Sequence, residues 1–124
     1  MSVVDVIVAL FFLQIKHLVA DFYLQTDKMV AGKAIYGNLQ GMLHSGYHAV
    51  GTFIVLYFFI GWQYALLLAI FDFVTHYHID WTKMNWGNRD IKNKRFWQHL
   101  GLDQFAHYTV YLAITIVAVA SQLP

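Results

Sequence analysis

The sequence lacks several residue types, and each absence narrows what the protein can be. It contains no cysteine, which excludes disulfides, thiolate metal ligands and a cysteine nucleophile. Its acidic residues are all aspartate, and its one proline is Pro124, so no helix before that position is broken by a proline. Charged residues make up only 12% of the chain, against about 25% in soluble domains.

Apolar residues take the place of the missing charge. The chain of 124 residues is 59% hydrophobic and 18% aromatic, so it cannot cover itself with polar side chains, and lipid is the expected solvent. The net charge of +1 says little about partners, and there is no strong nucleic-acid signal. The residues up to Asp5 carry no basic side chain, so we interpret the first apolar stretch as a retained span and not as a cleaved signal peptide.

Four stretches are predicted to cross the membrane as helices of about 20 residues each. Each has an apolar half and a polar half, and the order of the halves alternates along the chain. In an up-down-up-down arrangement all the polar halves lie in one leaflet, and the short connection at Gly61 forces the middle pair into an antiparallel hairpin. The expected fold is all-α, a four-transmembrane-helix bundle forming a single integral membrane domain over 1–124. The predicted spans are about 3–25, 39–60, 62–82 and 99–122.

The two longer connections, 26–38 and 83–98, carry most of the basic residues. The opposite side carries Asp5 and no lysine or arginine. By the positive-inside rule we expect a multi-pass protein with cytoplasmic basic loops and both termini outside.

An internal repeat relates the polar residues of the two halves. Four pairs are each separated by 59 residues, and three of them are identical in residue type. We interpret the chain as two tandem helical hairpins, about 3–60 and 62–122, related by a pseudo-two-fold axis along the membrane normal. Asp72 breaks the symmetry, because Leu13 stands at the matching position. The four pairs are His17 with His76, Asp21 with Asp80, His44 with Asp103, and His48 with His107.

These residues are candidate metal ligands. Charged side chains inside a bilayer are costly, from about 2.5–3.5 kcal/mol each, and divalent cations would compensate them. Histidine with aspartate suits zinc, manganese or iron, and this many ligands predicts two ions, with zinc favoured. For any single pair, a structural hydrogen-bond network is an equally good interpretation. The predicted metal ligands are His17, Asp21, His44, His48, Asp72, His76, Asp80, Asp103 and His107.

A few further polar residues have predicted roles. Asp72 is also a candidate general base, and Lys83 is expected to bind substrate or to pair with Asp80. Lys16 is expected to extend toward the membrane surface. His78 lies on the helix face opposite the candidate ligands, and His99 comes one turn before Asp103 with its role open.

Three motifs resemble a known family: His17-Leu-Val-Ala-Asp21-Phe-x-Leu-Gln25, His76-x-His-Ile-Asp80-x-x-Lys83 and Asp103-Gln104-x-x-His107. They are similar to an uncharacterised domain-of-unknown-function family of small bacterial and phage integral membrane proteins, and the resemblance covers nearly the whole chain. More distantly, the sequence resembles membrane-bound proteins grouped as metal-dependent hydrolases, and the zinc-dependent phospholipase C and single-strand nuclease superfamily. There, helical histidines and aspartates hold a zinc cluster that cleaves phosphoesters. The chain departs from that superfamily in having no glutamate and in its expected membrane embedding.

The resemblance implies a bacterial inner-membrane protein, and together with the ligand pattern it predicts a metal-dependent hydrolase of a phosphoester, with lipid-linked phosphoesters among the candidate substrates. The expected partners are the lipid bilayer and a lipid or phosphate-containing substrate, with oligomerisation open. Three alternatives remain: a di-iron oxidoreductase suggested by His44-Ser-Gly-Tyr-His48, an ion or proton transporter, and a non-catalytic module that metal ions hold together.

Overall fold

The computed structural model describes residues 1–123, which form five α-helices, one π-helical turn and no strand. The all-α prediction is therefore confirmed. The elements are α1, Val3–Val19; the π-helical turn η1, Ala20–Leu24; α2, Asp27–Lys33; α3, Leu39–Ile60; α4, Trp62–Trp86; and α5, Lys94–Ala120.

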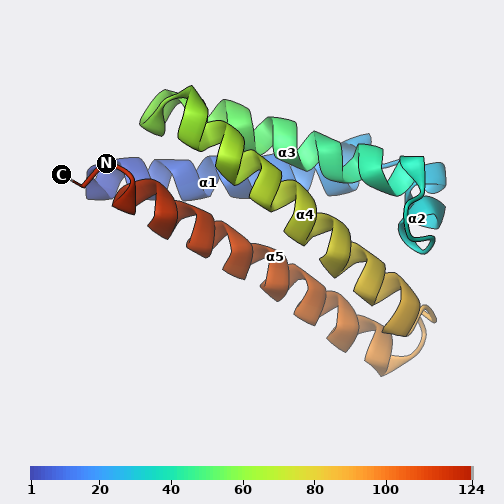
Figure 1. The fold of residues 1–124 in the computed structure, drawn as a ribbon. Helices are drawn as coiled ribbons and strands as arrows, with labels where there is room; N and C mark the ends of the chain where they lie inside the picture. Colours follow the sequence, from blue (N-terminus) through green and yellow to red (C-terminus); the bar gives the residue numbers. More distant parts are fainter. Residues whose placement is uncertain (124) are drawn as a thin grey trace.

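The four long helices form an antiparallel bundle with α2 at one end (Figure 1). Neighbouring helices in the bundle are α1 with α3, α3 with α4, α4 with α5, and α5 with α1. Both termini lie at the same end as the α3–α4 turn, while α2 and the α4–α5 connection lie at the other (Figure 1). Gly61 makes the α3–α4 turn with a φ of 78°, a conformation that glycine adopts without a steric penalty. The hairpin predicted at this position is confirmed.

The number of membrane-length apolar helices differs from the prediction. Three segments of the described chain are long and apolar enough to cross a membrane: Val3–Leu24, Leu39–Ile60 and Lys94–Ala120. The expected fourth span, α4, is not among them, although its 25 residues are long enough. Asp72, His76, His78 and Asp80 all fall in α4 and lower its mean hydropathy. The prediction of four apolar spans is corrected to three, and the fourth long helix carries the most polar part of the bundle.

The end of the bundle that contains both termini is apolar inside and outside. Leu13, Leu56 and Ile114 are completely buried in its core. On the surface, Phe58 and Ile116 are 77% and 68% exposed, respectively. A helix that is hydrophobic all round is typical of a membrane span or of a buried core, and the apolar surface of this half has the character expected of the first.

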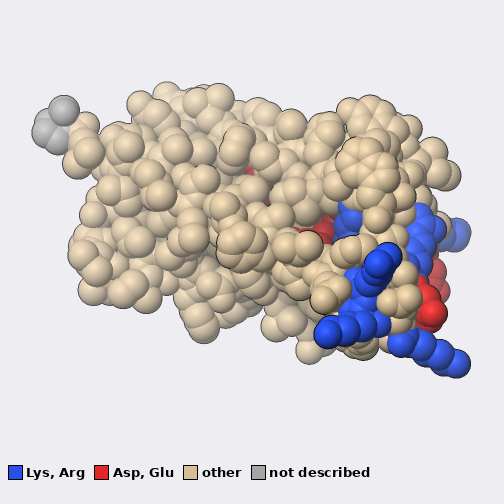
Figure 2. Space-filling view, turned by 90° about the horizontal axis from the view of Figure 1, so that it is seen from below, with Lys and Arg blue, Asp and Glu red and all other residues tan. Residues whose placement is uncertain are grey.

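The opposite end is basic. Figure 2 shows lysine and arginine side chains gathered at one end of the molecule, with the rest of the visible face free of them. They belong to α2, the end of α4, the following connection and the start of α5. One lysine, Lys16, is instead buried in the middle of the bundle, which is not the extended position expected from the sequence.

Helix α2 lies in a segment that was expected to be only a connection. Thr26 caps it by accepting a hydrogen bond from the Met29 amide. Gly32 lets α2 approach α3 closely, because a Cβ atom there would lie 2.8 Å from the Gln40 Cβ. This close packing fixes Lys33, the last residue of α2, against the polar half of the bundle, where it is 8% exposed.

Candidate metal centre

The end of the first long helix supplies His17 and Asp21. His17 lies in the last turn of α1, and Asp21 lies in the π-helical turn η1. The His17 Nε2 and Asp21 Oδ2 atoms are 3.1 Å apart. A π-helical turn re-aims the side chains after it and is frequent at functional sites. Here it brings the Asp21 carboxylate to face α3 as well as His17.

Helix α3 contributes His44 and His48, which stand one turn apart and are completely buried. Both Nε2 atoms lie 3.1 Å from the same oxygen, Asp21 Oδ1. The His44 Nε2 is also 3.2 Å from the His76 Nε2. Four donors from η1, α3 and α4 therefore converge on one point.

Helices α4 and α5 contribute a second convergence. Asp80 lies one turn after His76, and its Oδ1 is 3.5 Å from the His107 Nε2. The same His107 nitrogen is 3.6 Å from the Asp103 Oδ1. All four side chains are buried. Asp80 also contacts the group of donors described before it, since its Oδ2 lies 3.4 Å from the His44 Nε2.

Eight of the nine predicted ligands thus fall into three overlapping groups whose donor atoms lie within 4.8 Å of one another. We call Asp21, His44, His48 and His76 the first cluster, and Asp80, Asp103 and His107 the second cluster. A third group, His17, His76 and His107, links them. Within the described residues, such groups could hold a metal ion.

The spacing and the unpaired atoms of the clusters fit a divalent cation. Ligands about 2.0–2.2 Å from a tetrahedral zinc ion lie roughly 3.3–3.6 Å from each other, and the contacts of the second cluster are 3.5 and 3.6 Å. Those distances are too long for good hydrogen bonds. The buried His107 Nε2 and Asp103 Oδ1 have no hydrogen-bond partner among residues 1–123. Buried polar atoms without a partner are costly, and a bound cation would satisfy both.

A pocket of about 180 Å³ opens onto these groups from the basic end. Asp21 and Asp80 line it together with Lys33 and Lys83. The Lys33 Nζ is 2.9 Å from Asp80 Oδ2, and the Lys83 Nζ is 3.0 Å from Asp103 Oδ2. Lys83 therefore pairs with Asp103, not with Asp80, which was the partner considered from the sequence. Two ammonium groups therefore line the pocket, each paired with a carboxylate of the second cluster.

Asp72 belongs to none of the three groups. Its Oδ2 is 2.6 Å from the Lys16 Nζ and accepts a hydrogen bond of the same length from the Thr52 hydroxyl. Lys16 reaches this position beside Gly51, where an added Cβ would lie 3.3 Å from the lysine stem. These contacts show Asp72 compensating the charge of Lys16, and its ligand or general-base role stays a prediction.

The remaining histidines lie outside the clusters. His78 is exposed and bonded to Tyr36, as expected for the face of α4 opposite the ligands. His99 accepts a hydrogen bond from the backbone amide of Asn88 at 2.7 Å, so it stabilises the α4–α5 connection.

Three neighbours of the clusters, Lys33, Tyr111 and Thr52, were not predicted from the sequence. Nothing in the sequence placed Lys33 near the candidate ligands, because helix α2 was not predicted. Tyr111 and Thr52 could have been found: each lies one turn beyond a histidine, and they are 59 residues apart like the ligand pairs. The Tyr111 hydroxyl is 2.7 Å from the His17 Nδ1, while Gln104 Oε1 is 3.2 Å from its Nε2.

Comparison with known proteins gives one match. A family model described as a protein of unknown function (DUF3307) matches residues 9–123. No curated protein and no solved structure matches the chain.

Proposed function

The chain belongs to the DUF3307 family of proteins of unknown function, and from its site we propose that it is a membrane-embedded, metal-dependent hydrolase of phosphoesters. The observation that carries the proposal is the position of the clustered ligands. Histidines and aspartates from four helices converge, and two of the aspartates, Asp21 and Asp80, line a pocket together with two lysines.

The donor set favours two divalent ions, one at each cluster. All the donors are imidazole nitrogens and carboxylate oxygens, which suit zinc first and manganese or iron as alternatives. A pair of such ions activates water and neutralises phosphate oxygens during an in-line displacement. The unpaired atoms of Asp103 and His107 support a cation at the second cluster in particular.

The chain's own residues would bind and orient the substrate. Lys83 and Lys33 offer positive charge at the pocket entrance, where an anionic phosphate would arrive. Gln104, which also lines the pocket, contacts His17 and the Asp103 side chain and would hold both in place. Hydrolysis breaks the phosphorus–oxygen bond to the leaving alcohol; the hydroxyl of water stays on phosphorus and its other proton goes to the alcohol.

The repeat supports two equivalent half-sites. The contact between His17 and Asp21, at 3.1 Å, has its counterpart between His76 and Asp80, at 3.3 Å. Likewise, the Asp21 contact to His48 corresponds to the Asp80 contact to His107. We propose that the two hairpins arose by duplication and that the pseudo-two-fold axis passes between the clusters.

The proposed setting is the bacterial inner membrane with the basic end in the cytoplasm. The exposed apolar surface and the basic residues gathered at one end support this orientation. The sealed apolar core around Leu13, Leu56 and Ile114 argues against a transport path through the bundle. The pocket that reaches Asp21 and Asp80 argues against a purely structural metal site.

Metal analysis and hydrolysis together test the proposal. Protein purified in detergent should contain about two transition-metal ions per chain and should cleave a chromogenic phosphoester. A chelator should abolish cleavage, and added zinc, manganese or iron should restore it. Protein free of bound metal, or hydrolysis that survives complete metal removal, would contradict the proposal.

A further inference from the structure

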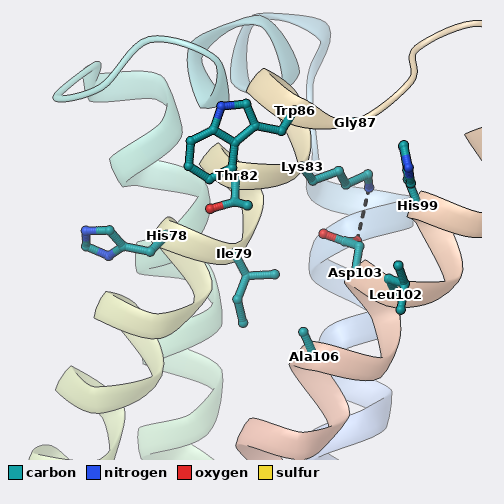
Figure 3. A pocket seen from close by; sticks show the side chains of 10 residues that line it. All are labelled: His78, Ile79, Thr82, Lys83, Trp86, Gly87, His99, Leu102, Asp103 and Ala106. Carbon is teal, nitrogen blue, oxygen red and sulfur yellow. Dashed lines mark hydrogen bonds and ion pairs between the residues drawn. The ribbon is translucent and has the colours of Figure 1, made fainter.

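A second, larger pocket lies between α4 and α5. It has a volume of about 410 Å³, and Figure 3 shows Lys83 and Asp103 pointing toward each other between the two helices, whereas His78 points away from α5. The part of the groove farther from the basic end is lined by the apolar residues Ile79, Leu102 and Ala106. Leu102 is 65% exposed, so this part opens on the outer surface of the bundle and not on its interior.

The polarity of the groove changes along its length. Toward the basic end it reaches Lys83, whose ion pair with Asp103 joins α4 to α5 across the groove (Figure 3). Trp86 lies at the same end and is 72% exposed, as is typical of a side chain at a membrane–water interface. A molecule fitting this groove needs a long apolar part that enters the membrane and an anionic part near the basic end.

The groove also borders the candidate metal centre. Lys83 lines both the groove and the smaller pocket that contains Asp21 and Asp80. Asp103, which belongs to the second cluster, lines the groove as well. An anion held by Lys83 would therefore stand beside the clustered ligands while its apolar part remained between α4 and α5.

We propose that the α4–α5 groove binds the acyl chain of a membrane lipid whose phosphate headgroup is held by Lys83 at the metal centre. The inference rests on the proposed function and names its substrate class as a phosphate-bearing lipid that enters sideways from the bilayer. A water-soluble phosphoester would occupy only the smaller pocket.

Photocrosslinking in vesicles tests the lipid's position without relying on turnover. The full chain is reconstituted in phosphatidylcholine vesicles containing phosphatidic acid with a photoreactive group in its acyl chain, and crosslinked peptides are identified by mass spectrometry. Crosslinks should concentrate on the segments of α4 and α5 that contain Ile79, Leu102 and Ala106. Crosslinks distributed evenly over the lipid-facing surface would overturn the proposal.

Two matched variants sharpen the test. Leu102→Trp fills the groove, whereas Leu112→Trp makes the same change on the same helix at another exposed position, 53% exposed. We expect Leu102→Trp to reduce groove crosslinking roughly tenfold, the loss expected from about two unburied methylene groups, and Leu112→Trp to leave it unchanged. Equal effects of the two variants would contradict a specific lipid site.

Hydrolysis separates the two proposals. If a soluble phosphoester is cleaved but groove crosslinking is absent, the lipid inference fails and the hydrolase proposal stands. If groove crosslinking occurs but neither phosphatidic acid nor a soluble ester is cleaved, the hydrolase proposal fails and the lipid site stands.

Discussion

The two clusters differ in the number of donors that the protein supplies to each. The first cluster gathers four donors from η1, α3 and α4, and two of its histidines share one Asp21 oxygen. The second cluster has three donors from two helices, and both of its carboxylates also contact a lysine. In metal enzymes, structural ions are enclosed by protein ligands, whereas catalytic ions keep a position open for water or substrate. The contrast suggests that the first cluster holds an ion in place and that the second, beside Lys83, performs the chemistry.

Removing a matched ligand from each cluster should give the largest effects. His48 and His107 are 59 residues apart, like the other ligand pairs; His48 belongs to the first cluster and His107 to the second. We expect His107→Ala to lower hydrolysis by roughly 1,000-fold or more, as for a group that acts as a unit with its neighbours. Metal analysis of each variant should show one ion lost.

The hydrolysis that each of the two variants retains shows which cluster performs the chemistry. His48→Ala should lose the first ion and some stability but retain more hydrolysis than His107→Ala. If the two variants lose activity equally and both lose all metal, the clusters work as one inseparable centre and the proposed division is wrong.

The buried ion pair beside the first cluster should give the next largest effect. Lys16→Met leaves the Asp72 carboxylate, 1% exposed, without its partner, and we expect a loss of about 3–5 kcal/mol in unfolding free energy. The double variant Lys16→Met with Asp72→Leu should recover most of that loss, because two apolar residues replace the pair. Unfolding in detergent micelles measures both; a double variant as unstable as the single would contradict this account, because removing the unpaired carboxylate would then have recovered nothing.

A smaller effect is expected from the lysine beside the second cluster. Lys83→Met should lower kcat/KM for a phosphoester by about 10–100-fold through loss of charge at the pocket entrance, while the metal content stays the same. The side chain of Lys83 is 29% exposed, so little loss of stability is expected. Lys92→Met, at an exposed position of the same basic end, is the control and should retain full activity. Loss of metal from Lys83→Met would instead mean that the lysine only orders Asp103.

The smallest effect concerns a single hydroxyl. Tyr111→Phe removes the contact to the His17 Nδ1 and should weaken metal affinity by about 10-fold, the range seen when a residue supporting a ligand is lost. Thr52→Val, at the equivalent position in the repeat, removes a bond to Asp72 and should leave metal affinity unchanged. Titration of metal-free protein with zinc distinguishes them. Identical affinities in both variants would remove His17 from the ligand set.

Much of this architecture could be predicted from the sequence because it follows from periodicity. Four long helices, the turn at Gly61 and the convergence of the paired histidines follow from helical spacing and the 59-residue offset. Contacts that depend on three-dimensional packing could not be predicted. Lys33 reaches Asp80 only because Gly32 lets α2 lie close to α3.

The role of Asp72 shows the same limit. Its spacing from His76 and Asp80 places it on the ligand face of α4, which is why it was expected to bind metal. Whether a carboxylate on that face meets a metal or a lysine depends on the neighbouring helix. Here Lys16 on α1 reaches it, and a pattern read along one helix cannot contain that information.

The ion pair between Lys16 and Asp72 also has a consequence for how the protein is made. It joins α1 to α4, two helices that lie diagonally across the bundle, and its two residues are 56 positions apart in the chain. During synthesis α1 emerges first, so its lysine meets no matching carboxylate until α4 has been added. A charge in lipid is costly, and α1 should therefore settle into the bilayer only after most of the chain has been translated. Biogenesis of this small protein would be a late, concerted assembly and not a stepwise insertion of independent helices.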